Sequence, residues 1–172
     1  PADDKIIDVE HPLSIDAEGQ LLASVMAKKY SVSANHVLID IPFGRTTKVK
    51  NRKQANHLAR MFEAIGKELG MNVKVLITDG TQPIGNGVGP LLESEDVMAV
   101  LRNDPLAPED LKKKALRMAG VLLEMTGKYR NGKKMAKKIL QSGKAYSKMK
   151  EIIKAQGKQN KIFLGEFCFE IK

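Results

Sequence analysis

Cysteine and aromatic residues are scarce in this chain. Its 172 residues include one cysteine, no tryptophan and only 5% aromatic side chains. A single thiol, Cys168, excludes an internal disulfide framework and a cysteine-rich zinc site. So few aromatic rings leave little surface for stacking on nucleic-acid bases, and no known nucleic-acid motif is present. The composition therefore argues against a disulfide-stapled, zinc-finger or base-stacking protein.

Long apolar runs are also missing. The longest, residues 37–41 and 73–77, have the length of strands, and none is long enough to span a bilayer. The first ten residues are acidic and polar, unlike a secretion signal. Together with the single cysteine, these features predict a cytoplasmic protein. The three histidines lack metal-ligand spacing, and we expect neither a metal nor a cofactor.

Positive charge is abundant, with 29 Lys and Arg against 20 Asp and Glu and a net charge of +9. The basic residues gather in residues 28–60, 112–117 and 128–161. The last two groups are typical of solvated helix faces. Such an excess favours anionic ligands or simply solubility. A non-catalytic module that binds phosphate or nucleic acid is one interpretation, and salt-dependent DNA binding without nucleotide preference would support it.

Hydrophobic patterning predicts an α/β fold. A helix is expected over 18–30, a strand over 36–41 ended by Pro42, a helix capped by Asn51 and running to Leu69, and a strand over 72–78. These elements make a βαβ unit with parallel strands. Further helices are predicted at about 91–102, at 109–125, 132–140 and 145–155, then a linker at 157–160 and a strand-like segment at 162–171.

The helix between the two predicted strands has an apolar face. The predicted sheet is small. The predicted buried positions are Ala55, Leu58, Ala59, Phe62, Ile65 and Leu69. Two strands make a poor sheet alone. We therefore expect further strands outside this sequence. The absence of an initial Met before Pro1 fits either processing or a missing upstream part.

Two loops leave the carboxyl ends of the predicted strands, where open α/β sheets bind ligands. The first, PFGRTTKVK, carries Arg45, Thr46, Thr47 and Lys48, whose cations and hydroxyls suit a phosphate or a sugar phosphate. A solvated basic loop is the plainer interpretation.

The second loop, DGTQPIGNGVGP, is rich in glycine. At Gly85 and Gly87 backbone N–H groups can approach a ligand. The spacing is neither a dinucleotide fingerprint nor a P-loop, and a role in tight turns alone is equally compatible.

The helix before the first strand offers Ser24 and Lys28, four residues apart on one face. They could share a ligand, although a small helix residue beside a surface cation is the default interpretation. Asp16 precedes this helix and is either a cap or, if buried, a proton donor.

At these residues the chain resembles a known family. The thymidine phosphorylase superfamily is similar to three blocks of the chain, HPLSIDAEGQLLASVMAKK, HVLIDIPFGRTTKVK and LITDGTQPIGNGVGPLLE. The residues of all three blocks resemble its AMP phosphorylase branch. The similarity continues through VLRNDPLAPEDL and SGKAYSKMKEIIKAQG. It covers nearly the whole chain and fades after Gly157.

The resemblance implies the two-domain fold of pyrimidine nucleoside phosphorylases, with an active site between a small helical domain and an α/β domain. Residues 1–34 would belong to the helical domain, 35–157 to the α/β domain, and 158–172 to a linker and the start of a C-terminal β element. Members are pentosyltransferases that act as dimers or larger homo-oligomers. They use inorganic phosphate to release a base and a sugar 1-phosphate; the AMP branch forms adenine and ribose 1,5-bisphosphate. No membrane or nucleic-acid partner is implied.

Carried over by position, Asp16 matches the proton donor to the base. Ser24 and Lys48 match nucleotide-binding positions of the AMP branch, while Ser24 and Lys28 match the base-binding pair of the thymidine branch. Lys48 could hold a 5′-phosphate, which would favour a nucleotide.

Two departures qualify the resemblance. The thymidine branch has a base-binding arginine near the position of Val9 and Glu10, where none stands here, which weakens the alternative of a pyrimidine nucleoside phosphorylase. The family's phosphate-binding segment and C-terminal domain have no counterpart in the chain, so we expect the isolated chain to be inactive.

Overall fold

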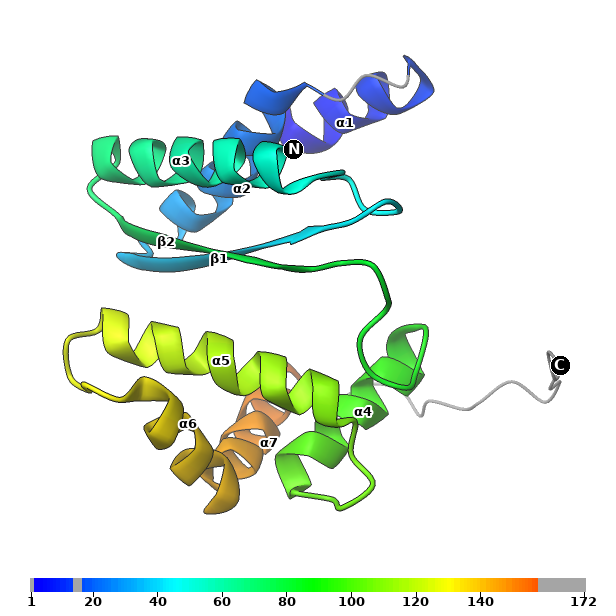
Figure 1. Cartoon of the computed structure of the whole chain (residues 1–172), viewed down its shortest axis with the longest axis vertical. Helices are drawn as coiled ribbons and strands as arrows, with labels where there is room; N and C mark the ends of the chain where they lie inside the picture. Colours follow the sequence, from blue (N-terminus) through cyan, green and yellow to red (C-terminus); the bar gives the residue numbers. More distant parts are fainter. Residues whose placement is uncertain (1, 14–16, 158–172) are drawn as a thin grey trace, which may run out of the picture. The chain divides into compact units, whose positions relative to one another are not determined.

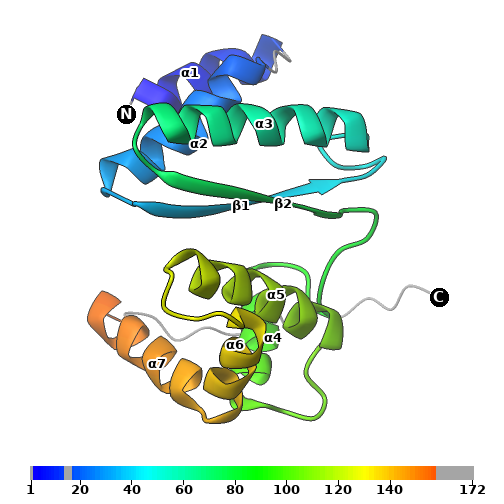
Figure 2. The same ribbon diagram turned by 60° about the vertical axis from the view of Figure 1, so that its left-hand side comes forward.

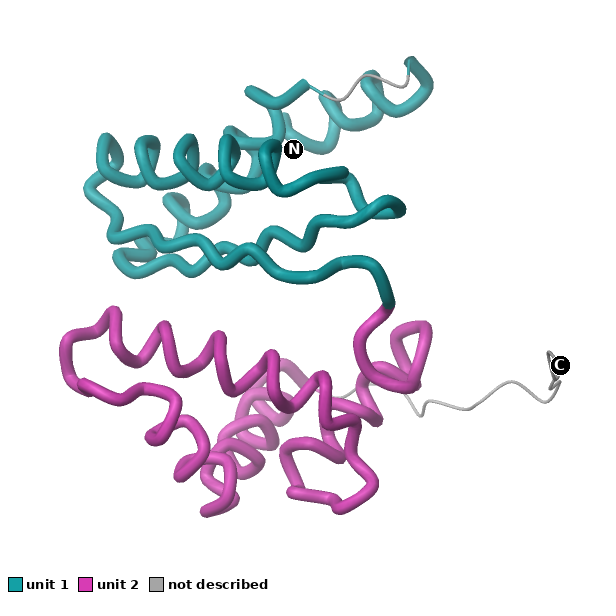
Figure 3. Tube along the Cα trace, viewed as in Figure 1, with its two compact units in different colours: residues 1–82 teal, residues 83–172 magenta. Residues whose placement is uncertain are grey.

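The computed structural model describes residues 2–13 and 17–157. The chain divides into two compact units, Pro1–Gln82 and Pro83–Lys172, which Figure 3 colours separately. The sequence instead predicts that the domains of the whole protein divide after residue 34, and that division stays a prediction.

Unit 1 is a parallel βαβ unit preceded by two helices. Its elements are α1 (Ala2–Leu13), α2 (Glu18–Ser31), β1 (His36–Phe43), α3 (Arg52–Glu68) and β2 (Asn72–Asp79). The register pairs His36 with Asn72 at one end of the sheet and Phe43 with Asp79 at the other. This confirms the predicted α/β class with its parallel βαβ core. Figures 1 and 2 show α2 and α3 on the same side of the two strands.

The core of unit 1 lies between these helices and the sheet. Leu22 and Met26 of α2 meet the inward residues of β1 and α3; the other buried members are Val37, Ile41, Val49, Ala55, Leu58, Phe62 and Met71. Ala59 and Ile65 pack partly against this cluster, as their spacing predicts. Leu69 is 37% exposed, so its predicted burial is wrong. The reason is that α3 ends at Glu68, and Leu69 forms its C-cap.

Strand β1 continues two residues beyond its predicted end, through Pro42 and Phe43. Successive residues of a strand turn their backbone groups to opposite sides. Since the Phe43 carbonyl accepts from the N–H of Gly80, Pro42 turns its nitrogen away from β2. A proline in that position removes no hydrogen bond from the β1–β2 ladder.

Helix α1 has no counterpart in the sequence prediction. None of residues 2–13 is buried, and Ile6, Val9 and Leu13 are exposed. A helix without a buried apolar stripe lacks the periodicity that identifies helices in a sequence.

Unit 2 consists of helices in the part of the chain that the structure describes. They are α4 (Pro90–Arg102), α5 (Glu109–Met125), α6 (Gly132–Gln141) and α7 (Lys144–Gln156), each within one residue of its predicted ends. Gly120 of α5 and Gly132 of α6 bring these two helices into backbone contact. The predicted strand-like segment at 162–171, with Cys168, lies outside the described residues. Among the described helices, none combines the length and apolar character needed to cross a bilayer.

Candidate functional site

A polar cluster joins α1 to α2 in unit 1. Gln20, Ser24 and Lys28 follow one another at intervals of four residues, so they line one face of α2. Asp3 of α1 lies against that face and contacts all three. We call these four residues the Asp3 cluster.

The Asp3 carboxylate is the centre of this cluster. Its Oδ2 accepts a hydrogen bond from Ser24 Oγ at 3.0 Å and lies 2.7 Å from Lys28 Nζ, while Oδ1 accepts from Gln20 Nε2 at 3.2 Å. Lys28 Nζ also donates to Ser24 Oγ at 3.1 Å. The Asp3 side chain is 23% exposed and that of Lys28 59%. Ser24 and Lys28, four residues apart on one face, are thus hydrogen-bonded to each other, and both contact a carboxylate that the sequence did not indicate.

Hydrogen bonds within the cluster shift the pKa values of its two charged groups, Asp3 and Lys28. The hydrogen bond from the Lys28 ammonium, and then that from Ser24, lower the pKa of the Asp3 carboxyl. In return, the hydrogen bond to Asp3 raises the pKa of Lys28. Both groups therefore carry their charges near neutral pH.

The loop after β1 is folded on its own backbone. Thr47 Oγ1 lies 2.6 Å from the carbonyl oxygen of Val49 and 3.0 Å from that of Gly44. The N–H of Gly44 donates to the Val49 carbonyl at 3.0 Å. The Thr47 hydroxyl thus supports the loop, and the exposed side chains of Arg45, Thr46 and Lys48 extend from it.

The two predicted loops meet at the carboxyl edge of the sheet. Gly80, directly after β2, donates its N–H to the Phe43 carbonyl at 2.9 Å. A Cβ atom at Gly44 would lie 3.0 Å from the carbonyl carbon of Gly80, and one at Gly80 would lie 2.5 Å from Thr47 Cγ2. The absence of both side chains allows this close approach. The parallel pairing of β1 with β2 places these two loops beside each other.

The Asp79 carboxyl closes the second turn. Its Oδ1 accepts from the N–H of Thr81 at 2.9 Å, and this hydrogen bond lowers the pKa of Asp79. An ionised carboxylate therefore stands at the end of β2.

The glycine-rich loop in unit 2 directs its N–H groups to carboxylates of the same unit. Gly85 donates to Asp110 Oδ2 at 3.1 Å, and Gly87 to Asp96 Oδ2 at 2.8 Å. The N–H of Gly89 donates to Glu93 Oε1 at 2.9 Å. A phosphate bound to these groups would have to displace a carboxylate. The phosphate contact suggested for Gly85 and Gly87 stays a prediction.

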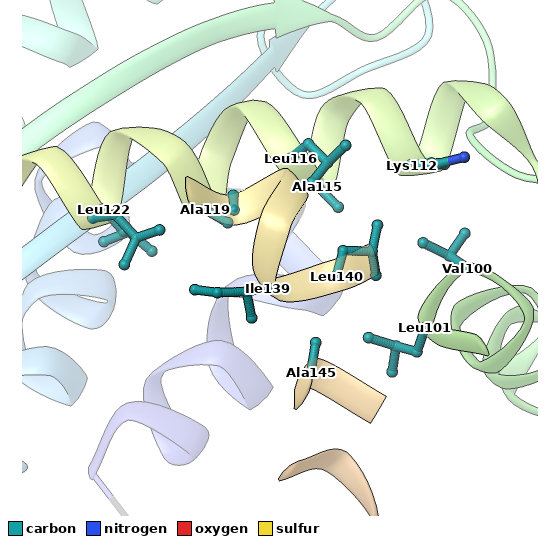
Figure 4. A pocket seen from close by; sticks show the side chains of 12 residues that line it. Val100, Leu101, Lys112, Ala115, Leu116, Ala119, Leu122, Ile139, Leu140 and Ala145 are labelled. Atoms are coloured by element: carbon teal, nitrogen blue, oxygen red, sulfur yellow. The ribbon is translucent and has the colours of Figure 1, made fainter. Parts of the chain in front are cut away.

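An apolar groove of about 380 Å³ lies in unit 2. Figure 4 shows side chains such as Leu116 of α5, Leu140 of α6 and Ala145 of α7 along it, with Lys112 the charged residue among those that line it. A nucleotide site needs several polar groups that fix the ligand's orientation. This groove lacks them and is a poor candidate for the active site.

Of the predicted site residues, Asp16 lies outside the described residues. Asp3 and Gln20 were missed by the sequence reasoning. The interval of four residues from Gln20 to Ser24 to Lys28 was visible, whereas Asp3 comes from a helix that the pattern does not reveal. In the described ranges 2–13 and 17–157, no group of three or more acidic, histidine or cysteine side chains could hold a metal ion.

Comparison with known proteins supplies the family. No protein-family model matches the chain. Proteins named "Putative thymidine phosphorylase" from Methylococcus capsulatus and from a Bradyrhizobium species are each 47% identical to it over 175 residues, covering 100% of the chain and 34% of each relative. One of the same name from Nitrobacter hamburgensis is 50% identical over 159 residues, covering 91% of the chain and 31% of the relative.

The parallel βαβ unit, with polar loops at its carboxyl edge, defines an α/β protein. By its sequence, this chain belongs to the thymidine phosphorylase superfamily. It spans about a third of the length of the curated relatives it matches.

Proposed function

We propose that the full-length protein carrying this chain is a phosphorylase that uses inorganic phosphate to release a base from a nucleoside 5′-monophosphate. The observation that carries the proposal is the pair of Ser24 and Lys28, joined on one face of α2. These two side chains would bind the base through hydrogen bonds. The chain that carries them is matched along its whole length by a relative named for a nucleoside phosphorylase.

The proposed substrate is AMP, which would give adenine and ribose 1,5-bisphosphate. Support comes from the loop after β1, where Arg45 and Lys48 are exposed cations of the kind that hold a phosphate. No arginine stands near Val9 and Glu10 to bind a pyrimidine in the manner of the thymidine branch. We propose that Lys48 contacts the 5′-phosphate and that Arg45, Thr46 and Thr47 support it.

In the proposed reaction, a phosphate oxygen bonds to C1′ of the sugar as the bond from C1′ to the base breaks. The bonding electrons leave with the base, which takes a proton from Asp16. Positive charge develops on the sugar and negative charge on the base, so an acid beside the base and an anion beside the sugar stabilise the transition state. We propose that inorganic phosphate is the co-substrate and that the reaction needs no cofactor. We propose that the protein acts in the cytoplasm as a homodimer or larger homo-oligomer.

Phosphorolysis of thymidine or another pyrimidine nucleoside is the second candidate. The names of the relatives favour it. Ser24 and Lys28 are compatible with either base, since both present hydrogen-bonding edges.

The test is phosphate-dependent release of base by the full-length protein from AMP, adenosine and thymidine. We expect the highest kcat/KM for AMP. Equal or better use of thymidine would overturn the assignment to AMP. Failure to release any base, combined with salt-dependent DNA binding, would instead favour a non-catalytic module.

A further inference from the structure

We propose that Asp3 is a positioning residue that makes Ser24 a hydrogen-bond acceptor and Lys28 a donor toward the base. The inference rests on the proposed function, because it concerns the same base site. It adds a residue to that site and states which chemical pattern on the base the site accepts.

The first step concerns the hydroxyl of Ser24. A serine hydroxyl has one hydrogen to donate and two lone pairs to accept with. The hydrogen is directed to Asp3 Oδ2 at 3.0 Å, and one lone pair accepts from Lys28 Nζ at 3.1 Å. Toward a ligand, Ser24 therefore has a single lone pair to offer, and it can only accept.

The second step concerns the ammonium of Lys28. Of its three N–H groups, one is directed to Ser24 Oγ and one to Asp3 Oδ2. These two contacts leave the third N–H unaccounted for on a side chain that is 59% exposed, and an ammonium can only donate. The cluster thus presents an acceptor beside a donor.

This pattern complements one kind of base edge. A base must offer an N–H next to an unprotonated nitrogen or a carbonyl oxygen. The 6-amino group and N1 of adenine do so, and so do the N3–H and a carbonyl of thymine. Unsubstituted purine, which lacks the 6-amino group and has no N–H on its six-membered ring, has nothing to donate to Ser24.

The third step is the role of Asp3 itself. Its second oxygen is held by Gln20 at 3.2 Å, so the carboxylate is oriented before any ligand arrives. Without it, the Ser24 hydrogen could turn to a backbone carbonyl of its own helix. The long side chain of Lys28 would also lose its anchor. Asp3 acts through Ser24 and Lys28, with no contact of its own to the base.

The experiment uses the full-length protein and compares AMP with the 5′-monophosphate of unsubstituted purine riboside, which lacks the 6-amino group. The variants are Asp3→Asn, Ser24→Ala and the double variant, with Asp8→Asn as the matched control on an exposed residue of the same helix. The amide that Asp3→Asn introduces can donate to Ser24 and so release the hydroxyl hydrogen of Ser24 toward the ligand.

We expect the wild type to prefer AMP over the analogue by about tenfold, the usual value of one hydrogen bond. Asp3→Asn should lower kcat/KM for AMP by about tenfold or more and remove most of that preference, while Asp8→Asn keeps both. In the Ser24→Ala background, Asp3→Asn should leave the preference unchanged, because the two residues act as one unit.

An unchanged preference in Asp3→Asn, or a change that persists in the Ser24→Ala background, would overturn the role of Asp3. If Asp3→Asn fails to fold by circular dichroism, Asp3→Ala takes its place, since it also removes the acceptor of the Ser24 hydrogen and must likewise lower the preference. A wild type that releases no base from any nucleotide refutes the proposed function as well. If the wild type prefers thymidine, only the assignment of AMP as the substrate is refuted. The effect of the same variants is then measured as kcat/KM for thymidine.

Discussion

The ion pair between Asp3 and Lys28 has a defined dependence on pH. The folded-state pKa of Asp3 lies below its unfolded value, so this carboxyl stabilises the fold above about pH 4 and loses that effect as the pH falls through the folded pKa. The folded-state pKa of Lys28 is raised, so its contribution is complete below about pH 10 and is lost as the pH rises through the folded pKa. The contact between α1 and α2 should hold across neutral pH.

Titration of the Asp3 side-chain carboxyl by carbon NMR checks this. We expect a pKa below the ordinary value for aspartate in the wild type, and an increase in Lys28→Ala because the main cause of the depression is removed. An ordinary pKa in the wild type, or no response to Lys28→Ala, would contradict the ion pair.

Asp16 is the residue on which the proposed chemistry depends most. Asp16→Asn removes the proton that the departing base takes up, and general acids typically contribute about 10²–10⁴-fold to rate. We expect kcat of the full-length protein to decrease by a factor within that range, while the far-ultraviolet circular dichroism spectrum stays unchanged. A rate near that of the wild type would remove Asp16 from the catalytic role.

Lys48 should distinguish a nucleotide from a nucleoside. If its ammonium holds the 5′-phosphate, Lys48→Ala should lower kcat/KM for AMP by about tenfold or more, as expected for a hydrogen bond to a charged group, and affect adenosine little. Lys53→Ala, at an exposed cation in α3, is the control for the loss of one positive charge. Equal losses for the two substrates would rule out a contact with the 5′-phosphate.

Among the elements, those with local signals were predictable. The side chain of Asn51 accepts from the N–H of Gln54 at 2.9 Å, so the N-cap of α3 is confirmed. The apolar strands and the helices of unit 2 also follow from their periodicity. Helix α1 could not be predicted because it buries no residue. The end of β1 could not be predicted because a strand accepts a proline only where its nitrogen faces away from the neighbouring strand, and the sequence does not show which side that is.

The contact between α5 and α6 depends on two glycines. A Cβ atom at Gly132 would lie 1.9 Å from the carbonyl oxygen of Gly120, a backbone atom that cannot turn aside as a side chain can. We expect Gly132→Ala to lower the free energy of unfolding by about 1–3 kcal/mol, the usual cost of overpacking. Urea denaturation measures it.

Gly19→Ala in α2 is the control for this prediction. Among the described residues, and apart from its chain neighbours and its own helix backbone, no atom lies within 4 Å of a Cβ at that position, so alanine should stabilise the helix by up to about 1 kcal/mol. A neutral or stabilising effect of Gly132→Ala would show that α5 and α6 are less closely packed than the structure indicates.

For the whole molecule, the matched relatives are about three times as long as this chain. By the family resemblance, the phosphate-binding segment precedes the matched stretch. We therefore expect the isolated chain to release no base from AMP in the presence of phosphate, whereas the full-length protein does. Turnover by the isolated chain within tenfold of the full-length rate would contradict this.

The candidate site was only partly predictable at this scale. Parallel pairing of two adjacent strands is enough to bring the loops after β1 and β2 together, and the interval between Ser24 and Lys28 is enough to place them on one face. The sequence could not reveal that Asp3 joins that face, since this depends on how α1 packs. Nor could it reveal that the carboxylates of Asp96 and Asp110 accept from the glycine-rich loop, because such contacts form only in the folded unit.

The contact of Gly44 with Gly80 has a consequence for protein engineering. The turn after β1 and the turn after β2 are in close contact at Gly44 and Gly80, so a change in the backbone of one turn affects the other. Anyone grafting a new specificity onto this scaffold should transplant residues 42–50 and 79–81 together as a single cassette. A library that randomises one turn alone should keep Gly44 and Gly80, because a side chain at either position would meet the other turn.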